Sequence, residues 1–131
     1  MIGQSVSIDL VGQRFTLRPT YRAMEAIEEQ TQVTCAELLE LVVRERMRIR
    51  EAVLIIWHGA QAAGEKFDDA DNLGALVFRE KMTSQQMRRS IAEYLLACLY
   101  APEDARKKLL AEIDPLLGIP PIESADPGAA G

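Results

Sequence analysis

Apolar and polar residues alternate over residues 1–18 of the chain. The apolar positions in this stretch are Val6, Ile8, Leu10, Phe15 and Leu17. A period of two on both sides of the Val11-Gly12-Gln13 turn predicts a β-hairpin over residues 1–18. Because an isolated hairpin is only marginally stable in water, its apolar face is expected to cover other elements.

After Pro19 the apolar residues recur every three or four positions, which predicts helices for most of the remaining chain. The expected helices cover residues 20–30, 34–43, 51–63, 71–78, 84–99 and 103–113. The third of them is apolar on most sides, as Val53–Trp57 illustrates, and this is typical of a central helix.

Residue types with strong preferences for helix ends mark several boundaries. The expected N-cap residues are Thr20, Thr34, Asp71 or Asn72, and Ser84. Glu37 stands three positions after Thr34, which predicts a capping box. Pro102 suits the first turn of the last helix, and Gly64 suits the end of the third, because glycine tolerates a left-handed backbone.

Together these patterns predict a mainly α fold, with a short hairpin followed by a compact bundle of about five to six helices. One helical domain is expected over residues 1–114. The composition changes at residue 115, because four of the six prolines lie at positions 115, 120, 121 and 127. Residues 115–131 are therefore predicted to form a disordered tail.

The charge balance weighs against a protein that binds nucleic acid. The net charge is -5, whereas binding to phosphate backbones requires a basic patch. Arg44–Arg50 is the most basic stretch, and we interpret it as a solvated helix end whose arginines complement the helix dipole. A small helical DNA-binding regulator is the alternative that this stretch leaves open.

The remaining composition favours a cytoplasmic protein that does not enter membranes. Cys35 and Cys98 lie in helical patterns and are expected to be reduced core thiols. The N-terminus lacks the basic and apolar segments of a secretory signal. The longest apolar run, Ala52–Trp57, is far too short to span a bilayer.

The segment IIWHGAQAAGEK over residues 55–66 has the glycine spacing of a phosphate-binding loop. In such a loop a lysine follows the second glycine and a hydroxyl residue comes next. Here Glu65 holds the lysine position, Lys66 comes one place late, and Phe67 follows Lys66 where a hydroxyl residue would be needed. Because an acid would repel phosphate and the glycines follow a helix, we interpret the segment as the end of that helix.

Two further chemical signals are weak. Residues 69–80 place acidic residues and a glycine as in a calcium loop, but Leu73 stands where an oxygen ligand is required. His58 is the only histidine and has no second ligand at metal-binding spacing. The sequence therefore predicts a protein that is not an enzyme, with no catalytic, cofactor-binding or metal-binding residues.

Partner contacts are the remaining functional candidates. Trp57 is expected to lie in the core, although a partly exposed tryptophan would be a suitable contact anchor. The predicted tail carries apolar residues that can dock on the helical body or on a partner. These residues are Leu116, Leu117, Ile119 and Ile122.

The first half of the chain resembles the tail assembly chaperone family of gene transfer agents and siphophages. The resemblance covers residues 4–66 and rests on a pattern rather than on one diagnostic motif. The matching features are Gly12, Leu17–Thr20, Ile27–Glu29, Leu38–Leu39, Ile55–Gly59 and Ala63–Gly64. Three features depart from the family pattern: Gln32 where glycine is frequent, the charged stretch at 44–50, and the half from Phe67 onwards.

This resemblance implies a non-catalytic protein that binds the tape measure protein during tail assembly. Such a chaperone keeps the apolar helices of its partner from aggregating and is absent from the finished particle. The resemblance also implies a frameshifted longer form of the chain as a second partner, and a homo-oligomer is a further expectation. Helix-in-groove contact is the expected binding mode.

Overall fold

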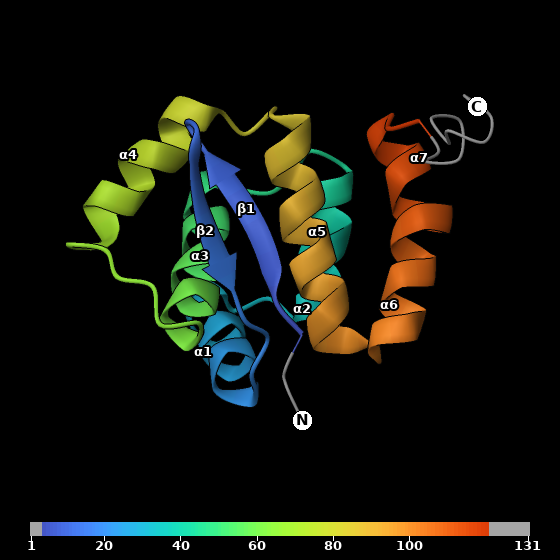
Figure 1. The fold of residues 1–131 in the computed structure, drawn as a ribbon, viewed down its shortest axis with the longest axis horizontal. Coiled ribbons are helices and arrows are strands. Elements are labelled where there is room, and N and C mark those ends of the chain that lie inside the picture. The colour runs from blue at the N-terminus through green and yellow to red at the C-terminus, as the bar shows by residue number, and fades with distance from the viewer. Residues whose placement is uncertain (1–3, 121–131) are drawn as a thin grey trace.

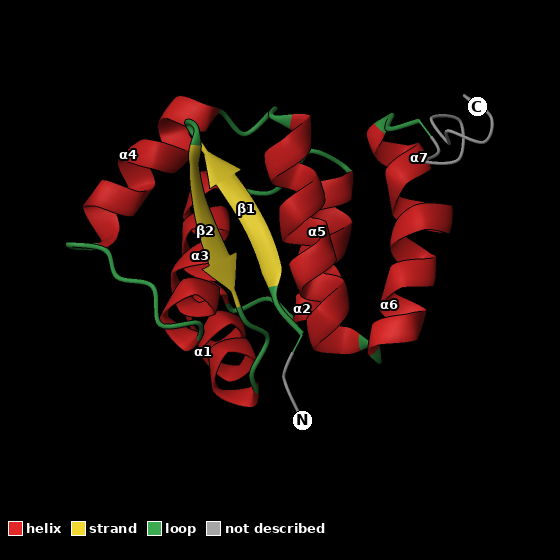
Figure 2. Cartoon of the chain, in the orientation of Figure 1, coloured by secondary structure: helices red, strands yellow, loops and turns green. Residues whose placement is uncertain are grey.

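The structure is a computed structural model that describes residues 4–120 (Figure 1). It contains one hairpin and a series of helices, which dominate the chain (Figure 2). The elements are β1 (Val6–Leu10), β2 (Gln13–Leu17), α1 (Tyr21–Thr31), α2 (Cys35–Val43), α3 (Ile49–Ala62), α4 (Ala70–Glu80), α5 (Gln85–Leu99), α6 (Pro102–Lys108), η1 (Leu109–Ile113) and α7 (Asp114–Leu117). The predicted mainly α fold with an N-terminal hairpin is confirmed.

The hairpin lies across two helices with its apolar face inward. β1 and β2 are antiparallel, with Val6 opposite Leu17 and Leu10 opposite Gln13. Val11 and Gly12 form the two-residue turn with φ of 50° and 80°, a left-handed geometry that matches the twist of the strands. β1 packs on α5 and β2 packs on α3, so the hairpin covers the seam between these helices (Figure 1).

The helices are arranged around α3 and α5. α1 and α4 pack on α3, whereas α2 and the residues after Tyr100 pack on α5. α6, η1 and α7 follow one another without a break, and we call residues 102–117 the C-terminal segment. Figure 1 shows α5 between the hairpin and this segment. The fully buried side chains come mainly from aliphatic residues, as the sequence predicts.

Gly59 allows β2 to approach α3 closely. The Arg18 N–H donates a 2.9 Å hydrogen bond to the Gly59 carbonyl. A Cβ at position 59 would lie 3.1 Å from the Leu17 Cβ and from the ring of Tyr94. The buried Tyr94 hydroxyl donates to the Arg18 carbonyl at 3.1 Å, so one strand end is fixed to two helices.

Most of the predicted helix ends are confirmed. The side chains of Thr20, Thr34 and Ser84 each accept a hydrogen bond from the first turn of the helix that follows. Glu37 completes the capping box at Thr34. Gly64 has a φ of 88°, and the Glu65 N–H donates 2.9 Å to the Ala60 carbonyl, which ends α3 as expected.

Two predicted helix starts are wrong. α3 begins at Ile49 rather than at residue 51, because Arg48 takes the N-cap position and its backbone N–H donates 2.8 Å to the Glu51 carboxylate. α4 begins at Ala70, because Asp69 rather than Asp71 or Asn72 is the N-cap. The Asp69 carboxylate accepts the Asn72 N–H at 2.9 Å. Asp71 lies in the first turn instead.

The last helix extends beyond the predicted end at residue 113. η1 is a wide turn in which the Asp114 N–H donates to the Leu109 carbonyl, five residues earlier. This wider turn accommodates Pro115, whose ring would clash with a carbonyl in a regular helix interior. Helical order therefore continues to Leu117, inside the predicted tail, and residues 121–131 of that tail lie outside the described residues.

Candidate functional site

An apolar groove lies on α5 between α2 and the C-terminal segment. We call it the apolar groove, and its volume is about 370 Å³. Its lining residues are Leu39, Glu40, Val43, Arg44, Leu96, Tyr100, Lys108, Glu112, Ile113 and Leu116. α2 and the C-terminal segment form the walls, and Leu96 from α5 is buried beneath them.

Hydrogen bonds to α5 fix the direction of both walls. Arg88, near the start of α5, donates 3.2 Å and 2.9 Å to the carbonyls of Val42 and Val43 at the end of α2. Arg89 makes two contacts of 2.8 Å and 3.0 Å with the buried Asp114 carboxylate. Both walls therefore run antiparallel to α5 and parallel to each other.

Large apolar side chains of the groove remain accessible to a partner. Leu116 is 67% exposed and Tyr100 is 41% exposed. Leu39 and Val43 are half-buried on the opposite wall. Exposed aliphatic and aromatic surface of this kind is typical of sites that bind another protein.

The rim of the groove carries one ion pair on each wall. On α2, Arg44 contacts Glu40 at 2.9 Å. On the C-terminal segment, Lys108 contacts Glu112 at 3.7 Å and also lies 4.9 Å from the centroid of the Tyr100 ring. Each wall is thus electrically balanced, with an acid and a base one helical turn apart.

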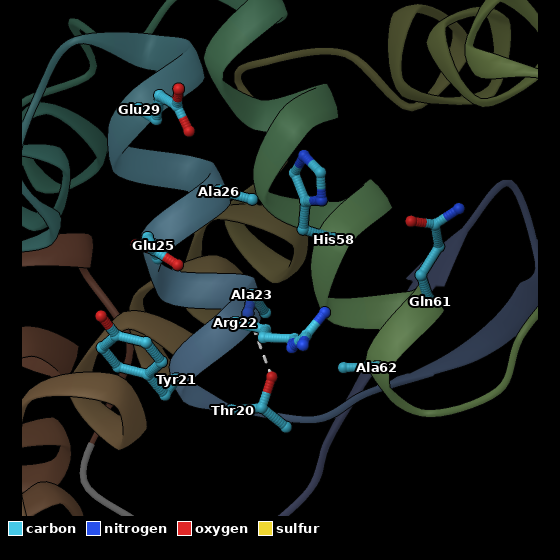
Figure 3. A pocket seen from close by; sticks show the side chains of 10 residues that line it. All are labelled: Thr20, Tyr21, Arg22, Ala23, Glu25, Ala26, Glu29, His58, Gln61 and Ala62. Atoms are coloured by element: carbon cyan, nitrogen blue, oxygen red, sulfur yellow. Dashed lines mark hydrogen bonds between the residues drawn. The ribbon is translucent and has the colours of Figure 1, made fainter.

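A second groove, between α1 and α3, is larger and more open (Figure 3). Its volume is about 980 Å³. Figure 3 shows Glu25 and Glu29 on α1 and His58 and Gln61 on α3 along its sides, with alanines between them. Tyr21, which is 77% exposed, is the one large apolar residue of its lining, and the other lining residues are polar or small.

His58 in this second groove is an ordinary half-buried side chain. Its Nε2 lies 3.2 Å from the Gln30 amide oxygen, and burial lowers its pKa below the usual value. Among residues 4–120 the structure places no group of three His, Cys, Asp or Glu side chains where they could hold a metal ion. Burial thus favours the neutral imidazole of His58, which contacts the Gln30 amide.

Trp57 lies in an aromatic cluster away from the apolar groove. Its ring stacks on Phe67 with centroids 5.9 Å apart, and Phe67 contacts Phe15 at 5.0 Å. Trp57 is half-buried against the core, where it joins α3 to β2 and to the loop after α3. This position fits the structural role that the sequence suggests for Trp57.

The predicted partner residues in the tail separate into different environments. Leu116 is exposed and lines the apolar groove, whereas Leu117 is buried against the helical body. Ile119 is half-buried against the core, and Ile122 lies outside the described residues. The structure brings Leu116 together with Leu39, Val43 and other groove residues, and it does not bring it together with Trp57.

The sequence contains a signal for the α2 wall in the width of the apolar stripe of that helix. Cys35, Leu38 and Val42 form the buried row of α2, and Leu39 and Val43 form a second apolar row beside it. A stripe of this width exceeds what one packing neighbour covers. Tyr100 has no such signal, because its place in the groove depends on the chain turning back after α5.

The two cysteines lie close enough to form a hydrogen bond with each other. Cys35 is buried and Cys98 is half-buried; a hydrogen bond with Cys98 and burial raise the pKa of the Cys35 thiol.

In the basic stretch Arg44–Arg50, Arg44 ends α2, but Arg48 contacts Glu51 at 2.8 Å at the start of α3. Arg44 stands at the C-terminal end of α2, where the helix-dipole interpretation requires a base, whereas that interpretation is wrong for Arg48, which stands at the N-terminal end of α3.

The fold and the groove define a small, mainly helical domain with a hairpin across two helices and an apolar groove on a third. In the described part of the chain, no helix is long and apolar enough to cross a membrane. Residues 4–101 match the family described as phage tail tube protein, GTA-gp10, and the chain belongs to this family. It is therefore related to the tails of phages and gene transfer agents, with a role in tail structure or assembly.

Comparison with curated proteins gave no significant match, and comparison with solved structures gave none either. The family match confirms the relationship to phage and gene-transfer-agent tails that the sequence suggests, and extends it from residue 66 to residue 101. α4 and α5 are thus part of the family pattern. The match ends one residue before α6, so the C-terminal segment lies beyond it.

Proposed function

We propose that this protein is a tail assembly chaperone that binds the tape measure protein while the tail is being built. The apolar groove on α5 is the observation that carries the proposal. It presents accessible leucine, valine and tyrosine side chains between two helical walls. An apolar surface of this kind can cover the apolar face of an amphipathic helix and so keep that helix from aggregating.

The composition of the chain supports this role. A net charge of -5 keeps the chaperone and its complex soluble, and it disfavours binding to nucleic acid. In the proposed role the protein acts in the cytoplasm of the host bacterium and leaves before the tail is complete. It needs no cofactor and performs no catalysis.

The printed family description suggests a second role, that of a structural component of the tail tube. The two roles differ in where the protein ends up. A tube component remains in the finished tail in many copies, whereas a chaperone is released from it.

Co-expression with the tape measure protein encoded nearby tests the proposal. We expect the chaperone to raise the soluble fraction of the tape measure protein and to purify with it as a complex. The control is co-expression with an unrelated acidic helical protein of similar size. If both proteins are folded and no complex forms, the proposal is wrong.

A further inference from the structure

We infer that the apolar groove accepts one amphipathic helix of the partner, recognised by the opposite order of charges on its two walls. The inference rests on the proposed function, because it takes the tape measure protein as the source of that helix. It adds the location of the contact, the secondary structure of the bound segment and its charge pattern.

The backbone of the walls favours a helical occupant. The central peptide groups of α2 and of the C-terminal segment are used in hydrogen bonds within those helices. An extended strand in the groove would leave its own N–H and C=O groups without partners, which is costly once water is excluded. A helix brings its backbone hydrogen bonds with it.

The size of the groove sets the length of the contact. The α2 wall runs over residues 39–44 and the opposite wall over residues 108–116. At 1.5 Å per residue, the longer wall is about two helical turns. The occupant therefore inserts apolar side chains at positions i and i+3 or i+4, with one more at i+7.

A second copy of this chain does not supply such a helix from its described residues. The exposed large apolar residues of the described chain are Tyr21, Ile49, Phe78, Tyr100, Leu110 and Leu116. Pairs on one helix face would have to be three, four or seven positions apart, and these are not. The half-buried apolar row of α2, Leu39 and Val43, already forms one wall of the groove, so we take the occupant to belong to a different protein.

The rim charges give the groove a defined pattern, in which the two acids lie diagonally across it and so do the two bases. Along α2 an acid, Glu40, is followed by a base, Arg44, whereas along the C-terminal segment a base, Lys108, is followed by an acid, Glu112. Because both walls run in the same direction, the charge order on one is the reverse of the order on the other. A complementary helix carries a base and then an acid on one flank and the reverse on the other flank.

One wall of the groove lies beyond the region that matches the family. Residues of the C-terminal segment form this wall, including Leu116 and both charges of the second pair. The family match ends at residue 101, before this wall begins. The region that matches the family thus supplies α2 and α5, and the C-terminal segment narrows their shared surface into a groove for one helix.

A pair of matched variants tests the location of the contact. Leu116→Glu places a charge in the groove, and Phe78→Glu places the same charge on α4, outside it. The two parent side chains are 67% and 62% exposed, so neither change disturbs the core. In co-purification with the tape measure protein, we expect Leu116→Glu to weaken binding at least about tenfold and Phe78→Glu to leave it unchanged.

The double variant Glu40→Lys with Arg44→Glu tests the charge order. It keeps the net charge and an ion pair on α2 but exchanges the positions of the acid and the base. We therefore expect weaker binding of the same partner. Thermal unfolding must show that each variant folds, and Tyr100→Ser provides a second groove variant if Leu116→Glu does not. Cross-linking from position 116 should reach a partner helix with the stated charge pattern.

The outcomes separate the inference from the proposed function. If the wild-type protein forms no complex, the proposed function fails. If the complex forms and survives both Leu116→Glu and Tyr100→Ser, the function stands and the groove is not the site, whatever the effect of Phe78→Glu. If the α2 charge reversal leaves binding unchanged, the charge-order part of the inference is overturned.

Discussion

Gly59 is the residue that sets the distance between the hairpin and the helical body. A Cβ there would lie 3.1 Å from Leu17 and from Tyr94. We expect Gly59→Ala to lower the free energy of unfolding by about 1–3 kcal/mol, because well-packed cores resist added atoms. Urea unfolding measures the change.

Gly74 provides the matched control for this substitution. It lies within α4, and an added Cβ there would have no atom within 4 Å. Gly74→Ala should therefore raise stability by about 0.5–1 kcal/mol, through the better helix propensity of alanine. If both substitutions have the same sign, close packing at Gly59 is not the reason for its glycine.

Gln32 holds a backbone conformation that glycine adopts more easily. It ends α1 with a φ of 61°, in the left-handed region. This explains why glycine is frequent at the corresponding place in the family that the sequence resembles. We expect Gln32→Gly to raise the free energy of unfolding by about 1 kcal/mol, although the Gln32 side chain loses its bond to the Glu29 carbonyl.

Thermal unfolding of the Gln32 variants measures this effect. Gln32→Ala keeps the strained backbone and loses the same side-chain bond, so it should be less stable than the wild type. A Gln32→Gly protein that is no more stable than Gln32→Ala would contradict the argument from backbone strain.

His58 makes the stability of the protein depend on pH near neutrality. Burial lowers its pKa below 6.5 in the folded state, so between the two pKa values the unfolded chain binds more protons. The free energy of unfolding should therefore fall as the pH drops from 7.5 to 5.5. We expect His58→Gln to make this fall smaller, as urea unfolding at several pH values would measure. Equal pH slopes for the two proteins would exclude the His58 contribution.

At the scale of elements, two carboxylates connect the hairpin to α4 and to the loop after α3. Glu65 accepts the Thr16 N–H and Glu80 accepts the Val11 N–H, each at 2.7 Å. Glu65 is the acid that argues against a phosphate-binding loop in the sequence. In the structure the Glu65 carboxylate satisfies the Thr16 N–H, a backbone donor on the side of β2 that has no neighbouring strand.

A partly buried ion pair joins the C-terminal segment to α5, beside the buried apolar residues of the segment. The Asp114 carboxylate is 3% exposed and accepts two hydrogen bonds from Arg89, and Gln85 donates to the Leu117 carbonyl. We expect Asp114→Asn to cost about 1–3 kcal/mol, because it removes one charge from a partly buried pair. Amide hydrogen exchange should then become faster over residues 102–117.

Glu112→Gln is the control for the Asp114 substitution. Glu112 is exposed and contacts Lys108 at 3.7 Å, so its loss should change stability by less than about 1 kcal/mol. Uniformly faster exchange over the whole chain with Asp114→Asn would contradict a role confined to the C-terminal segment.

Elements with local signals could be predicted from the sequence. The caps at Thr20, Thr34 and Ser84 and the stop at Gly64 each depend on residues within about five positions of one another, and the hairpin depends on the alternation on both sides of its short turn. Features that depend on distant contacts could not. The hairpin contact of Glu80 joins residues 69 positions apart, and the wide turn that extends the last helix has no sequence signature that we recognise.

The candidate site shows the same division. Leu116 is one of the apolar residues that the sequence places in the Pro-rich tail, and in the structure it is exposed and lines the groove. The groove itself requires α2 and the C-terminal segment to flank α5, which is a property of the packed fold. The sequence therefore indicates one contributor, and the tertiary structure identifies the others.

At the scale of the whole molecule, the protein combines membership of a tail-protein family with an accessible apolar groove. The family match places the chain among proteins of phage and gene-transfer-agent tails. The proposed chaperone role depends on the apolar groove, one wall of which lies beyond the family match. A chaperone must bind its partner before assembly is complete and must be absent afterwards.

The most direct test is the molar ratio of this protein to the tape measure protein, measured by quantitative mass spectrometry. The ratio would be determined in complexes isolated during assembly and again in purified finished tails. The account predicts abundant protein in the assembly complexes and less than one copy for each finished tail. Many copies retained in finished tails would contradict the chaperone role and would favour a component of the tail tube.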